Sequence, residues 1–289
     1  MAVGTNIWTW WDGRWQQGDI PVMKAADHGT WLGTLVFDGA RAFEGLMPDL
    51  ELHLARLNNS ALAMGLNPVF SVDEMAALTA EGMRLLGKDR PVYIRPMAWS
   101  TGNGPGVVAP NPESTAFCLC LEELPMAAPT AAVTVTTTQF TRPTITSALV
   151  NAKAACLYPN NARMLREAFS KGFNNVLALD PLGNVAETAT ANVFMVKDGV
   201  VKTPVPNGTF LNGITRQRVI KLLQADGVEV EECTLSLQDF RQADEVFMAG
   251  NISKVTRVSR FDDVAYTSHA LSDRAREIYW SWAATGSRL

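Results

Sequence analysis

The residue that most clearly suggests chemistry in this chain is Lys153, in the segment SALVNAKAACLY that spans residues 147–158. Between Pro143 and Ala162 it is the only charged residue, and its neighbours are mostly small or apolar. If the segment is buried, the ammonium loses hydration and the neutral amine is favoured. A neutral amine is a nucleophile that can condense with an aldehyde to a Schiff base. The segment alone favours the simpler alternative, a lysine on a half-buried strand or helix end whose ammonium reaches solvent.

Two glycine-containing segments could bind an anionic group such as a phosphate. Gly213-Ile214-Thr215 stands at the start of a predicted helix, where unpaired N–H groups and the helix dipole suit an anion. Gly250-Asn251-Ile252-Ser253 is predicted to form a turn after an apolar strand, and such a turn can gather N–H groups. Arg56, on another predicted helix, could add a guanidinium. An ordinary helix cap and a solvated surface arginine are the alternatives.

Other common catalytic arrangements do not stand out in the sequence. The three histidines and four cysteines lack the spacing of metal ligands, and no Ser-His-Asp or Cys-His pattern is evident. Gly102–Gly106 is glycine-rich but lacks a P-loop lysine, so we interpret it as a flexible loop that could act as a lid. We therefore expect no metal site and four free, mostly buried thiols. Proton transfer would fall to a lysine or a carboxylate.

Length and composition indicate an ordinary globular enzyme. The 289 residues suffice for one large domain or two ordinary ones, and the chain is 47% hydrophobic and 19% charged. A net charge of −4 gives no general attraction to nucleic acid or anionic membranes. No apolar run approaches the length of a membrane span, and the N-terminus lacks the features of a secretory signal. We expect a cytoplasmic protein with no nucleic-acid or membrane partner.

Turn and linker signals divide the chain. The segment 122–129, with two prolines and little periodicity, predicts a linker. We predict a small N-terminal domain of residues 1–122, a linker of residues 123–131 and a larger domain of residues 132–289. Asp12-Gly13 and Asp198-Gly199 signal hairpins. Helices are predicted over residues 52–64, 72–86, 161–171, 213–225 and 271–283. The mixture of helices and strands predicts an α+β fold.

Several motifs occur together in one order along the chain. They are Phe37-x-Gly39-x-Arg41, His53-Leu-Ala-Arg56-Leu57, Tyr93-Ile-Arg95-Pro96, Ala152-Lys153 followed by Tyr158, Val185-Ala-Glu187 with Ala191-Asn-Val-Phe194, Leu211-x-Gly-Ile-Thr-Arg216 and Met248-x-Gly250. In this order they resemble the fold-type IV pyridoxal-phosphate (PLP) enzymes, above all the branched-chain aminotransferases. The resemblance covers about residues 7–265. It implies a two-domain fold like that of D-amino-acid aminotransferase, with a small α/β N-terminal domain and a larger domain containing a barrel-like mixed sheet.

The resemblance also implies PLP as the cofactor and a role for each residue that would bind it. Lys153 would hold the cofactor through a Schiff base and then act as the base and acid that move the α-proton. Glu187 would pair with the pyridine nitrogen and keep it protonated, so that the ring can act as an electron sink. Tyr158 would donate to the ring oxygen, and Leu211 would pack on the ring face. The phosphate would be bound by Arg56 and by the amides of Ile214, Thr215 and, after Gly250, Asn251.

A further five residues are expected to face the substrate: Leu32, Phe37, Arg41, Tyr93 and Arg95. A substrate carboxylate suits an arginine fork. Leu32 stands where many branched-chain enzymes have a tyrosine, and Asn251 replaces a common threonine. The loss of an aromatic hydroxyl changes how a carboxylate is held, and could make room for an amine that lacks one.

We expect a transaminase that moves an amino group between a small-molecule amino donor and a 2-oxo acid in a ping-pong cycle. Branched-chain L-amino acids with 2-oxoglutarate are the first expectation, which would place the enzyme in branched-chain amino-acid biosynthesis. An R-selective amine or D-amino-acid transaminase is the alternative, followed by an aminodeoxychorismate lyase. Outside PLP chemistry, the alternative is a binding protein in which Lys153 has no chemical role. Family members usually dimerise, so the resemblance implies a homodimer or a higher homo-oligomer.

Overall fold

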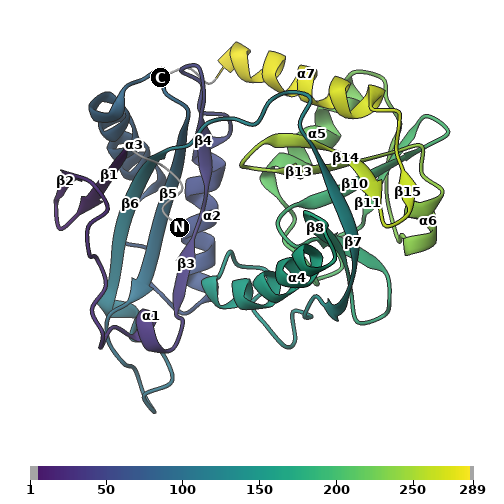
Figure 1. The fold of residues 1–289 in the computed structure, drawn as a ribbon. Coiled ribbons are helices and arrows are strands. Elements are labelled where there is room, and N and C mark those ends of the chain that lie inside the picture. The colour runs from purple at the N-terminus through teal and green to yellow at the C-terminus, as the bar shows by residue number, and fades with distance from the viewer. Residues whose placement is uncertain (1–5, 287–289) are drawn as a thin grey trace. The chain divides into compact units, whose positions relative to one another are not determined.

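The computed structural model describes residues 6–286, and the outermost residues of the two predicted domains, 1–5 and 287–289, lie outside this range. The described chain folds into two compact units, and Figure 1 labels most of their elements. Unit 1 contains the residues up to Met126 together with Asn151–Cys156, and unit 2 contains Ala127–Val150 together with Leu157–Thr285. The chain thus first leaves unit 1 within the predicted linker. The segment that carries Lys153 belongs to unit 1, whereas the predicted boundaries place it in the large domain.

Unit 1 is built on a six-stranded antiparallel sheet with the order β2-β1-β6-β5-β3, in which β4 also pairs with β5. Its strands are β1 (Ile7–Trp11), β2 (Arg14–Gln17), β3 (Leu35–Phe37), β4 (Ala40–Ala42), β5 (Val92–Ser100) and β6 (Thr115–Glu123). The first hairpin turns at Asp12-Gly13, as predicted, because both residues adopt the positive φ that this two-residue turn requires.

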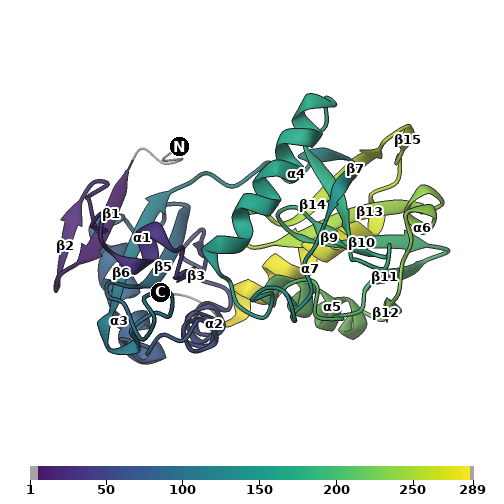
Figure 2. The ribbon, with the colours of Figure 1, turned by 90° about the horizontal axis from the view of Figure 1, so that it is seen from below.

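Two helices, α2 (Leu50–Ala63) and α3 (Val72–Leu86), lie below this sheet in Figure 2. Helix α3 begins with a capping box, in which the Ser71 hydroxyl accepts a hydrogen bond from the Glu74 N–H. Both helices lie on the same side of the sheet in Figure 2, and α3 packs closely against it, since a Cβ added at Gly82 would lie 2.5 Å from Leu121 of β6. The unit also contains the short helices α1 (His28–Trp31) and η1 (Pro112–Ser114).

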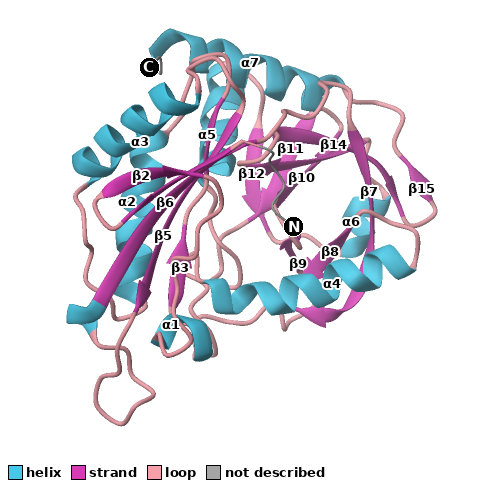
Figure 3. Cartoon of the chain, turned by 60° about the vertical axis from the view of Figure 1, so that its left-hand side comes forward, coloured by secondary structure: helices cyan, strands magenta, loops and turns pink. Residues whose placement is uncertain are grey.

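Unit 2 is built on a nine-stranded mixed sheet with the order β12-β11-β10-β13-β14-β7-β8-β9, and β15 pairs with β14. Its strands are β7 (Ala132–Thr141), β8 (Asn175–Leu179), β9 (Val185–Thr188), β10 (Asn192–Lys197), β11 (Val200–Pro204), β12 (Val230–Cys233), β13 (Glu245–Gly250), β14 (Lys254–Phe261) and β15 (Val264–Ala265). Three neighbouring pairs are parallel, namely β11–β12, β14–β7 and β7–β8. Figure 3 shows the curl of these strands, and the expected α+β class with a barrel-like mixed sheet is confirmed.

Both faces of the curled sheet are buried under apolar side chains. Along β10, Val193 and Met195 belong to one core, and Phe194 and Val196 belong to the other, as strand alternation requires. The second core also contains residues of α5 (Ile214–Ala225) and α7 (Ala270–Gly286), so these two helices cover the same face. The remaining helices are η2 (Ala155–Leu157), α4 (Tyr158–Ser170) and α6 (Leu237–Arg241).

The structure corrects two details of the sequence-based expectations. Helix α4 starts at Tyr158 rather than Asn161, since Pro159 is well tolerated in the first turn of a helix. All four cysteines are free, but only Cys118 and Cys120 are buried, whereas Cys233 is half-buried and Cys156 is exposed. Within residues 6–286, no helix is both long enough and apolar enough to cross a membrane.

Candidate active site

The backbone of Lys153 is fixed by hydrogen bonds on both sides. Its N–H donates to the Ser60 hydroxyl of α2 (3.0 Å), and its carbonyl accepts from the Phe37 N–H of β3 (3.0 Å). Ala154 forms a bridge to Val36, so the segment runs beside the edge strand of the unit 1 sheet. Lys153 itself is half-buried, and its Nζ lies 5.0 Å from the centroid of the Phe37 ring. Its side chain therefore starts from a well-anchored point of the backbone.

Four of the predicted substrate residues share one face of the unit 1 sheet. Phe37 is opposite Met97 on β5, and Arg41 is opposite Tyr93. Tyr93, Arg95 and Met97 alternate along β5, so they point to the face that α2 and α3 leave uncovered. The structure thus brings Phe37, Arg41, Tyr93 and Arg95 together on the face where Lys153 approaches Phe37. Leu32 is not on this sheet; it follows α1 and is exposed.

Gly39 lets the Tyr93 ring lie against the backbone of the Phe37–Arg41 motif. A Cβ at this position would come 2.3 Å from Tyr93 Oη and 2.8 Å from its ring carbons. Contacts this short are not compatible with a larger residue unless the ring moves. The glycine of the motif is therefore explained by close packing, and it helps to set where the Tyr93 hydroxyl lies.

The two arginines on this face have different surroundings. Arg95 pairs with the buried Glu122 (3.2 Å) and also contacts the Cys120 sulfur. Arg41 is fully buried, and its Nη2 donates to the Leu124 carbonyl (2.6 Å). Its Nε and Nη1 have no hydrogen-bond partner in the described part of the chain. Burial lowers the pKa of Arg41 to about 10, which still leaves the guanidinium charged at neutral pH.

Arg56 is held by a buried carboxylate that sequence reasoning missed. Its Nε and Nη2 donate to the two carboxylate oxygens of Asp38 at 2.6 and 2.8 Å. The ring of His53, one turn earlier on α2, lies 2.7 Å from the same carboxylate. Burial disfavours the ionised form of Asp38, but Arg56 and His53 outweigh burial and hold its pKa well below the usual range. The only signal in the sequence was an acidic residue inside the otherwise apolar motif Phe37-x-Gly39.

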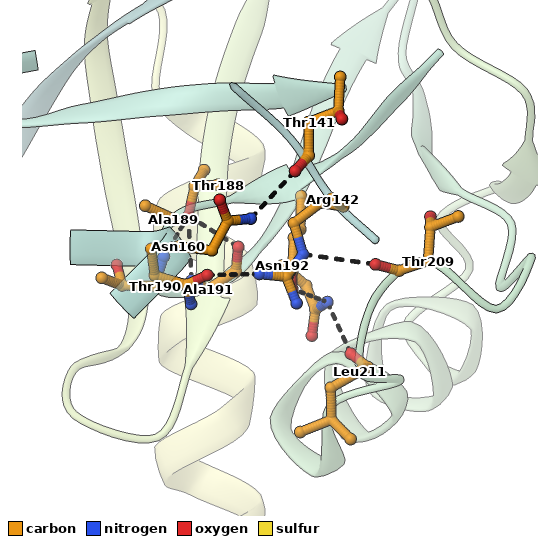
Figure 4. Close-up of polar contacts among 12 residues, drawn as sticks. Thr141, Arg142, Asn160, Thr188, Ala189, Thr190, Ala191, Asn192, Thr209 and Leu211 are labelled. Carbon is orange, nitrogen blue, oxygen red and sulfur yellow. Dashed lines mark hydrogen bonds and ion pairs between the residues drawn. The ribbon is translucent and has the colours of Figure 1, made fainter. Parts of the chain in front are cut away.

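Unit 2 contains the predicted carboxylate, Glu187, which is buried on β9. Arg142 lies 3.0 Å from one of its oxygens, and the Asn192 amide donates to the other at 3.3 Å. Asn192 also donates to the Leu211 carbonyl, while Arg142 donates to the Thr209 carbonyl (Figure 4). Arg142 and Asn192 were not predicted as site residues, although Asn192 lies within a motif of the resemblance.

Asn192 also joins the two predicted phosphate turns. Its side-chain oxygen accepts a hydrogen bond from the Gly213 N–H (3.2 Å), just before α5 begins. It is paired with Ala249 across β10 and β13, and Gly250 follows directly. A Cβ at Gly213 would lie 2.3 Å from the Asn192 oxygen, so this position needs a glycine. The uncapped start of α5, with the buried residues Ile214 and Thr215, therefore lies at the same end of the sheet as the turn at Gly250.

The turn after Gly250 contains further polar groups. Lys254 Nζ donates to the side-chain oxygen of Asn251 at 2.7 Å, and the side-chain nitrogen of Asn251 is buried without a hydrogen-bond partner in the described residues. Tyr158 begins α4, and its side chain is partly exposed. In the described part of the chain, no group of three or more histidine, cysteine and acidic residues could hold a metal ion.

The fold and the site define a class of enzyme. The amino-transferase class IV family matches residues 35–261, and the chain belongs to this family. The interpretation as an enzyme of the fold-type IV group is thus confirmed.

Particular relatives make the likeness more specific. An aminotransferase from Brucella abortus bound to the cofactor PLP is 56% identical, with a TM-score of 0.95 over 97% of this chain and all of that one. The branched-chain-amino-acid aminotransferase of Escherichia coli K12 is 31% identical over 275 residues, which cover 91% of this chain and 88% of the enzyme. A solved structure of the Escherichia coli branched-chain aminotransferase has a TM-score of 0.86 at 26% identity, over 96% of this chain and 94% of that one.

Proposed function

We propose that this protein is a PLP-dependent transaminase that moves an amino group between a branched-chain L-amino acid and 2-oxoglutarate. The observation that carries the proposal is the network around Asn192. It joins a buried carboxylate, Glu187, to two turns with backbone N–H groups, at Gly213 and Gly250. A phosphorylated pyridine needs these two kinds of group, an acid for its ring nitrogen and donors for its phosphate. Membership of class IV and the names of its relatives support the same conclusion.

The residues of unit 2 suit the cofactor because neighbouring side chains hold them in place. Glu187 would face the pyridine nitrogen, and Arg142 and Asn192 would fix the orientation of its carboxylate. Leu211 would pack on the ring, and Tyr158 would donate its hydroxyl to the ring oxygen. The amides of Ile214, Thr215 and Asn251 would bind the phosphate, for which the start of α5 offers unpaired N–H groups.

The residues in unit 1 would complete the chemistry. Bound PLP supplies an electrophilic aldehyde and an electron-withdrawing ring. Lys153 would bond covalently to the cofactor. Once the substrate's amino group has displaced it, the freed Lys153 amine would remove and return the α-proton of the substrate. Arg56, with its Nε and Nη2 clamped by Asp38, would bind the phosphate through the rest of its guanidinium.

We propose that Arg41, Tyr93 and Arg95 recognise the acidic groups of the two substrates and that Phe37 contacts their side chains. Arg41 suits this role because two of its buried nitrogens have no acceptor in the described residues. Leu32 would contribute an apolar surface without a hydroxyl, and for this reason the R-selective amine and D-amino-acid transaminases stay as the second candidate. The lyase is the third. A homodimer and a cytoplasmic location remain part of the proposal.

The absorbance spectrum of the purified protein with PLP tests the central role of Lys153. We expect a visible band from the lysine-linked cofactor in the wild type and in the control variant Lys171→Ala, since Lys171 is a surface residue paired with Glu167. We expect no such band in Lys153→Ala. A band that survives in Lys153→Ala would end the role proposed for this residue.

Half-reactions then decide the substrate. L-leucine should bleach the visible absorbance band of the lysine-linked cofactor, whereas D-alanine and an R-arylethylamine should leave this band largely unchanged. Bleaching by the amine alone would replace the branched-chain assignment with the R-selective one. Bleaching by D-alanine alone would favour a D-amino-acid transaminase.

A further inference from the structure

The turn between β13 and β14 contains a buried ammonium. Lys254 is only 1% exposed, and its backbone has a φ of 62°, in the left-handed region that few non-glycine residues adopt. It pairs with Gly250 across the turn, so that residues 251–253 form the loop between the two strands. Its Nζ lies 2.7 Å from the side-chain oxygen of Asn251. An unusual backbone conformation thus accompanies a contact between the lysine and the turn.

This contact determines which way the Asn251 carboxamide faces. An ammonium has three N–H donors and no acceptor, so it can bind only the oxygen of a carboxamide. The Asn251 nitrogen must therefore point away from Lys254. This nitrogen is buried and has no hydrogen-bond partner within residues 6–286. Because a buried donor without an acceptor is unfavourable, the geometry calls for an acceptor that a ligand would bring.

The surroundings favour an anionic acceptor. Arg276 of α7 donates from Nη1 to the carbonyls of Ser253 and Val255 at 3.0 and 3.1 Å, and so brings a second positive charge to the turn. Gly250 packs closely on Ala191, since a Cβ there would lie 3.0 Å from the Ala191 side chain. The next residue, Asn192, bonds to the start of α5. The side-chain nitrogen of Asn251 therefore lies at the same end of the sheet as the backbone N–H groups at the start of α5.

We propose that Lys254 is a positioning residue that holds the Asn251 carboxamide so that its nitrogen donates to the phosphate of the cofactor. The inference rests on the proposed function, because it takes PLP as the ligand. It adds a side-chain donor to the backbone amide assigned to Asn251, and it gives the buried Lys254 an indirect role. Lys254 acts through Asn251 and is not required to touch the phosphate.

The substitution Asn251→Asp tests the donor with little change of shape. The carboxylate still accepts from Lys254, and more strongly, so the turn should keep its structure. The N–H donor is lost, and a negative charge is placed beside the phosphate. We expect the Kd for PLP, measured by titration of the apoprotein, to rise at least about tenfold, since hydrogen bonds to charged groups are worth more than neutral ones. The Kd for pyridoxal, which lacks the phosphate, should change less than about twofold.

A double-mutant cycle tests the positioning role. Lys254→Met keeps a long side chain but frees the carboxamide, and we expect it to raise the Kd for PLP several-fold. In an Asn251→Ala background the same substitution should have almost no effect, because the group it positions is gone. Lys202→Met, which removes a lysine paired with Glu231 on the surface of unit 2, is the matched control and should leave the Kd unchanged.

The outcomes separate this inference from the function on which it rests. Suppose that the wild type binds PLP. If Asn251→Asp then has the same Kd for PLP, or if its Kd for pyridoxal rises as much as its Kd for PLP, the inference is wrong and the proposed function stands. An effect of Lys254→Met that persists in the Asn251→Ala background would show that Lys254 acts by another route. If the wild type binds no PLP, both the function and the inference fail.

Discussion

Asp38→Asn removes the charge that clamps Arg56. The carboxylate is fully buried, accepts two hydrogen bonds from Arg56 and one from the Gly39 N–H, and lies 2.7 Å from the His53 ring. Removing one partner of a buried ion pair typically costs about 3–5 kcal/mol, because the other charge stays uncompensated. Since the Arg56 side chain keeps some contact with solvent, we expect the lower end, about 3 kcal/mol. The free energy of unfolding in urea at neutral pH measures this loss.

Asp273→Asn is the matched control for this variant. Asp273 likewise accepts two hydrogen bonds from one arginine, Arg257, both at 2.6 Å, but its side chain is 45% exposed. Surface ion pairs contribute about 0–1 kcal/mol, so this variant should lose much less stability than Asp38→Asn. Comparable losses in the two variants would refute the claim that burial gives the Asp38 pair its strength.

The pH dependence supplies a second test of the same ion pair. The fold lowers the pKa of Asp38, so its contribution is fully present above the pKa of the unfolded state, roughly 4, and is lost as the pH falls below that value. The stability difference between wild type and Asp38→Asn should therefore be constant near neutral pH and shrink below about pH 4. A difference that stays the same down to low pH would show that shape, rather than charge, makes Asp38 important.

Three further predictions concern packing, a thiol and a second buried ion pair. Gly82→Ala should destabilise the protein by about 1–3 kcal/mol, because the new Cβ would lie 2.4 Å from the Trp15 ring, and Glu81→Ala next to it should have little effect in the same denaturation assay. A thiol reagent should label the exposed Cys156 faster than the buried Cys118 in the folded protein, although burial raises the pKa of both thiols, that of Cys118 to about 12; labelling kinetics that are unchanged in Cys156→Ser would contradict this. Arg142→Met should cost about 3–5 kcal/mol in urea unfolding, because it leaves the buried Glu187 without its arginine, and unchanged stability would mean that the pair is not strongly coupled.

Local features of the fold were predictable from the sequence because they depend on backbone preference and side-chain period. Asp12-Gly13 and Asp198-Gly199 form hairpin turns with positive φ at both residues, as the dipeptides predict. The helix predicted over residues 72–86 has those bounds, and its cap is Ser71. The order of motifs was sufficient to predict the family, which the match over residues 35–261 confirms.

The residues that hold the candidate site in place were decided only by the tertiary structure. Lys153 is anchored by Ser60, which is 93 residues away in the chain, and Arg56 is held by Asp38, which lies between β3 and β4. The segment around Lys153 belongs to unit 1, although a linear division of the chain puts it in the large domain. Periodicity and turn signals extend over a few residues, whereas a buried charge must find its partner wherever the chain folds back. Sequence alone therefore predicted the groups to which we assign the chemistry, and the fold decided which side chains hold them.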